Sequence, residues 1–170
     1  GCRFCQAGMI TRPVRERSIT GIGEMIEKGL AATGFEEVGL LSLSSADHSE
    51  IGDLAKGLAD RYEGTQTSLS LPSTRVDAFN IDLALELQRN GRRSGLTFAP
   101  EGGSERLRNV INKRVTKQDL VNTVTAAYGA GWRQVKLYFM VGLPTETDED
   151  VLQIAEMARE VIRAGRAAAP

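Results

Sequence analysis

The hydrophobic positions of this chain repeat with two different periods that alternate along its length. Apolar residues three or four positions apart are typical of helices that bury one face, and short apolar or alternating runs are typical of strands. The first pattern predicts helices over about 21–32, 49–62, 78–91, 104–112, 117–131 and 145–165. The second pattern predicts strands over 36–45, 67–73, 94–104 and 133–144.

Polar residues that can cap a helix stand at several of these helix starts. Ser18 or Thr20 can cap the first helix, Ser49 the second, and Thr116 the helix over 117–131. A side-chain oxygen at such a position accepts a hydrogen bond from a backbone N–H of the first turn. The last helix begins with acidic residues, which suit the positive end of a helix dipole.

Four strand–helix repeats, after an initial loop and helix, predict an α/β fold. Strands that alternate with helices pair in parallel, with right-handed crossovers. The active sites of such folds form at the carboxyl ends of the strands. The loops to search for chemistry are therefore 1–17, 44–49, 71–77, 99–104 and 141–147.

The composition excludes several classes of protein. Hydrophobic residues make up 41% and charged residues 25% of the 170 residues, and the net charge is −1. This near-neutral balance gives no electrostatic indication of nucleic-acid binding. The longest apolar run, 135–144, is too short to cross a bilayer. We therefore expect a cytoplasmic protein with no membrane partner.

Cys2 and Cys5 are the only cysteines of the sequence, and they stand three positions apart in the first loop. A thioredoxin-type dithiol would have its second cysteine in a first helical turn, which does not fit well here. A zinc knuckle needs two further ligands, and His48 alone cannot supply them. An inert pair and a partial set of iron–sulfur ligands both remain open.

Four segments, in order, carry a resemblance to the radical SAM superfamily. "GCRFC" resembles the end of its signature, C-x3-C-x-(aromatic)-C, with Cys2 and Cys5 as the second and third cysteines and Phe4 as the aromatic residue. "LSLSSADHSEI" stands where the superfamily binds the amino group of SAM. "FAPEGGSERLRNVINK" and "VKLYFMVGLPTETDED" resemble the fourth- and fifth-strand segments of the branch with methylthiotransferases and cobalamin-dependent enzymes. The residues of these segments most resemble those of an uncharacterised radical SAM family of that branch.

The resemblance implies a fold and a reaction. The fold would be a partial (β/α)6 TIM-like barrel with a mostly parallel sheet, truncated at both ends, so that residues 1–170 form part of a radical SAM core domain. The reaction would be the reductive cleavage of S-adenosylmethionine at a [4Fe–4S] cluster, which generates a 5′-deoxyadenosyl radical. The substrate stays unidentified, with methylation and methylthiolation as options. The first cluster cysteine would precede Gly1, so we expect this segment alone to be inactive.

The resemblance also assigns residues to the two cofactors, while it leaves the catalytic residues unknown. Cys2 and Cys5 would bind the cluster. The residues expected to bind SAM are Phe4, Ser44, Ser45, Asp47, Arg75, Glu101, Gly103, Lys113, Tyr138, Met140 and Gly142. Asp47 would meet the amino group of SAM, Glu101 the ribose hydroxyls and Lys113 the carboxylate.

Several of these residues have an ordinary structural role as an alternative. Asp47 can serve as a cap, Lys113 as a solvated helix end, and Met140 as part of the core. Arg75 can meet the SAM carboxylate or an anionic substrate, or pair with Asp77.

Two of the glycines have expected roles of their own. Gly103 would let the backbone approach the ligand closely. The two-residue period puts Tyr138, Met140 and Gly142 on one strand face.

Two further implications concern partners. Such an enzyme needs an electron donor of the flavodoxin or ferredoxin type, and cobalamin in the full-length protein is an additional option. The competing hypothesis is a non-catalytic α/β module whose CxxC pair is structural or binds zinc.

Overall fold

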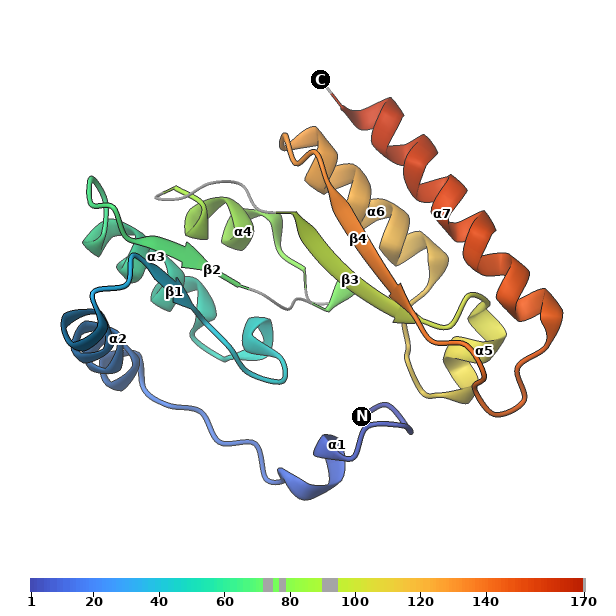
Figure 1. The fold of residues 1–170 in the computed structure, drawn as a ribbon, viewed down its shortest axis with the longest axis horizontal. Helices are drawn as coiled ribbons and strands as arrows, with labels where there is room; N and C mark the ends of the chain where they lie inside the picture. Colours follow the sequence, from blue (N-terminus) through green and yellow to red (C-terminus); the bar gives the residue numbers. More distant parts are fainter. Residues whose placement is uncertain (72–74, 77–78, 90–94, 170) are drawn as a thin grey trace. The chain divides into compact units, whose positions relative to one another are not determined.

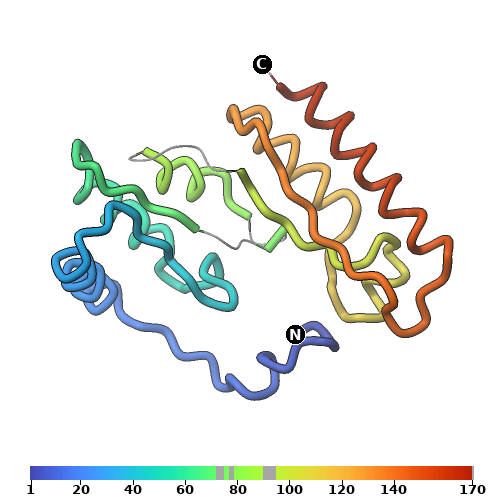
Figure 2. Tube along the Cα trace, viewed as in Figure 1, coloured from blue at the N-terminus to red at the C-terminus, as the bar shows by residue number. Residues whose placement is uncertain are grey.

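A computed structural model of the chain describes residues 1–71, 75–76, 79–89 and 95–169. The chain divides into two compact units. The β1–β2 unit comprises Arg15–Thr74 and Ala78–Ser94, and the β3–β4 unit comprises Gly1–Val14, Arg75–Asp77 and Gly95–Pro170. Figure 1 labels the elements, and Figure 2 follows the chain through them.

In the β1–β2 unit, helices pack around a short pair of strands. β1 (Glu37–Gly39) pairs in parallel with β2 (Ser68–Ser70). The helices are α2 (Ile19–Thr33), the 3-10 turn η1 (Ser45–Asp47), α3 (Ile51–Arg61) and α4 (Ile81–Leu87). The core of the unit consists of Ile26, Leu54, Ala55, Leu58, Leu69, Leu83 and Leu87.

The strand expected over 36–45 is much shorter in the structure, because serine side chains bind the backbone that follows it. The Ser44 N–H donates to Ser42 Oγ at 3.1 Å, and Ser45 Oγ donates to the Leu40 carbonyl at 3.0 Å. Such local bonds compete with the ladder of a sheet. The chain therefore leaves β1 at Gly39 and turns into η1.

Of the caps expected in this unit, one is confirmed and one is wrong. Ser18 caps α2 by accepting from the Gly21 N–H at 3.2 Å. Ser49 does not cap α3, because its N–H and hydroxyl both donate to the Glu16 carboxylate, at 3.0 and 2.6 Å. The cap position is taken by Glu50, which makes no side-chain cap bond.

The β3–β4 unit is built on a second parallel pair. β3 (Leu96–Glu101) pairs with β4 (Val135–Phe139), and the register shifts between Phe98 and Glu101. The helices are α1 (Ala7–Ile10), α5 (Glu105–Val110), α6 (Lys117–Gly129) and α7 (Asp148–Ala168). The core includes Phe98 from β3, Leu107 from α5, Leu120 and Val124 from α6, Trp132 before β4, and Met157 and Val161 from α7.

Both long helices of this unit start with a capping box. Thr116 exchanges hydrogen bonds with Asp119 at the start of α6, as its position predicts. Thr147 does the same with Asp150 at the start of α7, so this helix begins at Asp148 and not at the expected position 145. The reciprocal bonds satisfy N–H groups that the first turn of a helix leaves unpaired.

The predicted α/β class with parallel strands is confirmed. The described strands form two separate pairs, and the continuous partial barrel expected from the resemblance is not seen in them. Among the described residues, no helix has the length and apolarity needed to cross a membrane.

Candidate functional site

Cys2 and Cys5 lie together in one turn at the start of the β3–β4 unit. The Cys5 N–H donates to the Cys2 carbonyl at 3.1 Å, and α1 follows directly. Both thiols are free and partly exposed. No group of three or more His, Cys, Asp or Glu side chains that could hold a metal ion is found in the part of the chain that the structure describes. The turn therefore offers two soft ligands, and a complete set needs a further one.

The cysteine turn is fastened to the end of α5. The Arg3 N–H donates to the Ile111 carbonyl at 2.8 Å, and the Arg3 guanidinium donates to the Val110 carbonyl at 2.6 Å. In the opposite direction, Asn112 Nδ2 donates to the Gly1 carbonyl at 2.9 Å. Residues 1–3 and 110–112 are thus joined by three hydrogen bonds.

Glu101 and Lys113 form an ion pair one residue beyond this junction. Lys113 Nζ lies 3.4 Å from Glu101 Oε1, and the two side chains are 16% and 17% exposed. Glu101 ends β3 with φ +69°, a left-handed conformation that costs free energy for a residue with a Cβ. Its carbonyl accepts from the Met140 N–H at 2.8 Å, which ties it to the end of β4. The structure therefore holds this carboxylate in place against backbone strain.

Arg108 is a functional candidate that sequence reasoning missed. Its guanidinium is buried and donates to the carbonyls of Val115, Gly102 and Gly103, at 2.6, 3.1 and 2.9 Å. Burial lowers the pKa of the Arg108 guanidinium. It joins the turn after Glu101 to the segment after Lys113. No signal in the sequence distinguishes it from the exposed Arg106 two positions earlier.

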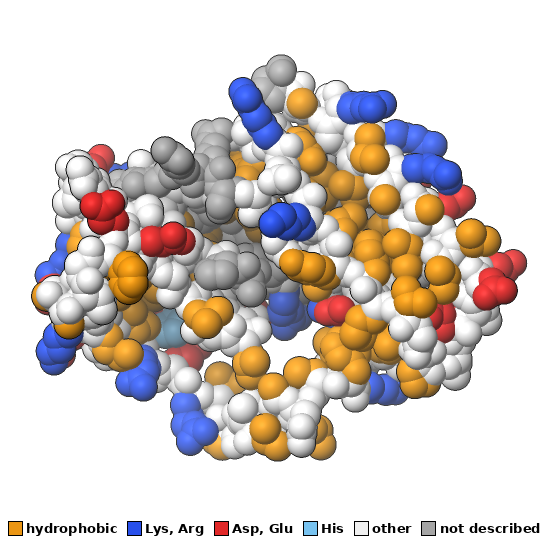
Figure 3. Space-filling view, in the orientation of Figure 1, with side chains coloured by type: hydrophobic (Ala, Val, Ile, Leu, Met, Phe, Trp, Pro, Cys, Tyr) orange, Lys and Arg blue, Asp and Glu red, His pale blue; other side chains and the backbone are white. Residues whose placement is uncertain are grey.

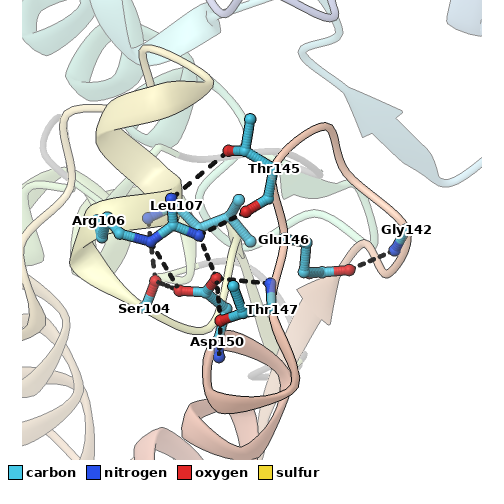
Figure 4. Close-up of polar contacts among 8 residues, drawn as sticks. All are labelled: Ser104, Arg106, Leu107, Gly142, Thr145, Glu146, Thr147 and Asp150. Carbon is cyan, nitrogen blue, oxygen red and sulfur yellow. Dashed lines mark hydrogen bonds and ion pairs between the residues drawn. The ribbon is translucent and has the colours of Figure 1, made fainter.

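A second polar cluster, shown in Figure 4, connects the starts of α5 and α7. The carboxylate of Asp150 is buried and accepts hydrogen bonds from the Ser104 hydroxyl, the Arg106 guanidinium, and the N–H and hydroxyl of Thr147. These donors hold the pKa of Asp150 well below its usual range, with Arg106 as the largest influence and Ser104 next. Arg106 also donates to the Thr145 carbonyl at 2.7 Å, which fixes the loop after β4.

Gly103 has a packing role in the structure. A Cβ atom at this position would lie 2.3 Å from the Asp150 carbonyl oxygen and 2.8 Å from the Ile154 N atom. Both distances are far shorter than van der Waals contact. Gly103 therefore allows close packing of the first turn of α7, and the backbone that approaches it belongs to this helix.

The candidates after β3 and β4 are spread over a strand end and a turn. Tyr138 lies on the exposed face of β4, and Met140 follows the last strand residue. Gly142 lies beyond the strand with φ +86°, so the expected common strand face does not reach it. Its N–H donates to the Glu146 carboxylate (Figure 4). Figure 3 shows apolar side chains at the surface of this unit, between charged ones.

In the β1–β2 unit, the three polar candidates lie on the turn after β1. The Ser44 hydroxyl donates to the Asp47 carboxylate at 2.5 Å, and Ser45 binds the backbone. His48 forms hydrogen bonds within this loop region, since its ring nitrogens contact the Arg17 carbonyl and the Glu50 N–H. These bonds fix the turn that carries the carboxylate.

The structure places the two remaining SAM-binding candidates in the β3–β4 unit. Phe4 is exposed between the cysteines, and Arg75 is exposed as well. The proposed partner of Arg75, Asp77, lies outside the described residues.

Known proteins resemble this chain over nearly its whole length. An uncharacterised protein of Methanocaldococcus jannaschii is 39% identical over 160 residues, which is 94% of this chain and 34% of the relative. The chain thus spans about one third of the length of that relative. These matches give no support to the competing hypothesis of a non-catalytic module. Residues 1–158 match the radical SAM superfamily, and the chain therefore belongs to this superfamily.

Proposed function

We propose that this chain forms the core of an enzyme that cleaves S-adenosylmethionine reductively at a [4Fe–4S] cluster. The observation that carries the proposal is the continuous contact from the cysteine turn to the Glu101–Lys113 pair through residues 110–112. Two soft ligands and a strained, partly buried carboxylate are thereby held by one short segment of chain.

The cysteine turn fits the cluster by the chemistry of its donors. Thiolates are the usual ligands of iron–sulfur clusters, and both thiols are free and reach the surface. Cys2 and Cys5 would supply two of three cysteine ligands, with Phe4 between them. When bound, the cluster supplies the electron that breaks the sulfonium C–S bond of SAM. The remaining cysteine of the signature would supply the third ligand.

The ion pair suits the two polar ends of SAM. The Glu101 carboxylate can accept hydrogen bonds from the ribose hydroxyls, and the Lys113 ammonium can pair with the methionine carboxylate. In the protein alone these side chains neutralise each other at 3.4 Å. A ligand that enters between them would replace this ion pair with new partners for both charges, so that neither mostly buried charge would be left unpaired.

The remaining candidates complete the site in our proposal. Asp47, held by Ser44, would take the amino group of SAM, with Ser44 and Ser45 nearby, and Arg75 would take a carboxylate. The adenine ring would lie along Tyr138, Met140 and Gly142. Gly103, which packs against α7, would also let the backbone approach SAM closely.

Several features of the whole protein belong to the proposal as well. Residues 1–170 would be part of one core domain, with the strand pairs as parts of a (β/α)6 barrel. A flavodoxin- or ferredoxin-like protein would supply the electron, and the reducing cytoplasm would keep both thiols free. The matches do not support cobalamin, so we leave it out. Methylation and methylthiolation remain alternatives for the final step.

Anaerobic reconstitution of the full-length protein with iron and sulfide tests the proposal. We expect a brown protein that, once reduced, converts SAM to 5′-deoxyadenosine and methionine. Variants Cys2→Ser and Cys5→Ser should lose both colour and activity. Glu101→Gln should keep the colour and lose activity, whereas the matched control Glu105→Gln, on the exposed side of α5, should keep both. A colourless wild-type protein after reconstitution would refute the proposal.

A further inference from the structure

We propose that Arg3 and Asn112 are positioning residues that lock the cysteine turn onto the end of α5, so that the cluster ligands keep a fixed distance from the Glu101–Lys113 pair. This inference rests on the proposed function. The side chains of both residues donate hydrogen bonds to backbone carbonyls, and neither needs to touch a cofactor.

Arg3 binds the carbonyl groups that α5 leaves unpaired at its end. The last carbonyls of a helix have no partner within the helix and carry the negative end of its dipole. The guanidinium of Arg3 meets the Val110 carbonyl, and its N–H meets the Ile111 carbonyl. A positive charge with a hydrogen-bond donor is favourable at this position, and the contact fixes the residue between the two cysteines.

Asn112 combines two properties that this position needs. Its backbone has φ +56°, a left-handed conformation that asparagine adopts more readily than most residues. Its amide donates to the Gly1 carbonyl at 2.9 Å. The next residue is Lys113, whose N–H donates to the Arg108 carbonyl at 2.8 Å. One turn of chain therefore carries both the contact to the cysteine turn and the lysine of the ion pair.

Burial contributes little to holding the cysteine turn. None of residues 1–17 is buried, and the four-residue helix α1 buries no side chain. The position of the two thiols therefore depends strongly on polar contacts. Loss of a single hydrogen bond should loosen the turn measurably without unfolding the core of the unit.

Thiol alkylation of the full-length protein without its cluster measures this docking directly. We compare the rates at which iodoacetamide modifies Cys2 and Cys5 in the wild type, Arg3→Ala and Asn112→Asp. Each variant should react roughly fivefold faster, because each loses one hydrogen bond. Arg3→Lys, which keeps a donor, should return toward the wild-type rate. Arg159→Ala, which removes an exposed arginine of α7, is the matched control and should react like the wild type.

A second variant at position 112 separates backbone strain from the side-chain contact. Asn112→Gly accepts a positive φ without cost and lacks the amide. We expect its thiols to react as fast as those of Asn112→Asp, with thermal unfolding close to the wild type. Rates equal to the wild type in both position-112 variants and in Arg3→Ala would overturn the inference.

A spectroscopic measurement connects docking to the cofactors. In the reconstituted, reduced protein, addition of SAM should shift the electron paramagnetic resonance signal, and this shift should weaken or broaden in Arg3→Ala and Asn112→Asp. A shift identical in all proteins overturns the positioning role and leaves the proposed function intact. Faster alkylation in the variants together with a wild type that binds no cluster refutes the proposed function and leaves the docking intact.

Discussion

Lys113 Nζ lies 3.4 Å from Glu101 Oε1, and this contact joins the end of β3 to the segment that follows α5. The two residues are twelve positions apart in the sequence, and both are largely shielded from water. A mostly buried ion pair is stable only while both partners are present, because one partner left alone is a desolvated charge. The pair is therefore sensitive to any ligand or substitution that changes one of its charges.

Glu101→Gln is expected to weaken SAM binding by about tenfold or more, because it replaces a charge-assisted hydrogen bond with a neutral one. Isothermal titration of the reconstituted protein with SAM measures the change. The control Glu105→Gln should bind SAM like the wild type. Equal affinities in all three proteins would exclude Glu101 from the ligand site.

Arg108→Met is expected to lower the free energy of unfolding by about 2–4 kcal/mol, because three carbonyl groups lose a buried donor. Urea unfolding measures this difference. Arg159→Met, at an exposed position of α7, should change it by less than about 0.5 kcal/mol. If both variants lost the same free energy of unfolding, the buried hydrogen bonds of Arg108 would make no special contribution to stability.

Asp150→Asn should reveal how the unit responds to acid. The pKa of the Asp150 carboxyl is lowered in the folded protein, chiefly by Arg106 and then by Ser104. Its stabilising contribution is therefore fully present above the ordinary carboxyl pKa of about 4, and is lost as the pH falls toward the lowered folded value. The wild type should be more stable than the variant at neutral pH.

The pH dependence supplies the check on Asp150. The gap between the urea midpoints of the wild type and Asp150→Asn should stay constant from about pH 7 to pH 5, and should shrink below about pH 4. A gap that widens on acidification would contradict the assigned sign.

Gly103→Ala and Gly29→Ala should have opposite effects on stability. A Cβ at Gly103 would meet the Asp150 carbonyl oxygen at 2.3 Å, so α7 must shift and the unit loses stability, by about 2 kcal/mol or more. A Cβ at Gly29 meets nothing within 4 Å and lies inside α2, where alanine is favoured by about 0.5–1 kcal/mol. Thermal unfolding of Gly103→Ala and Gly29→Ala measures the two opposite effects.

The sequence was most informative where the structure depends on local rules. Thr116 and Ser18 could be identified as caps because a cap depends on its own residue and the next few. The cap at Ser49 was wrong because a distant carboxylate, Glu16, takes its hydroxyl. β1 is shorter than predicted because serine side chains form hydrogen bonds with the backbone that follows it. A hydrophobic pattern does not show whether a serine favours a strand or a turn.

The candidate site shows the same contrast between features that local sequence predicts and contacts between distant residues. The cysteine turn and Glu101 stand in recognisable segments, and the structure places Lys113 in contact with Glu101. Arg108 and Arg3 went unnoticed because arginines that bind backbone carbonyls look like ordinary surface charges in a sequence. The packing of α7 on Gly103 could not be predicted, because the sequence does not show that this helix returns to it.

The contacts that hold the cysteine turn have a consequence for biosynthesis. Arg3 finds its carbonyl partner 107 positions later, and Gly1 meets an amide 111 positions later. At roughly 5–20 residues per second, these partners leave the ribosome several seconds after the two thiols. The nascent chain thus exposes both sulfur atoms before their anchor exists, and the cysteine turn can dock only after most of this segment has been synthesised.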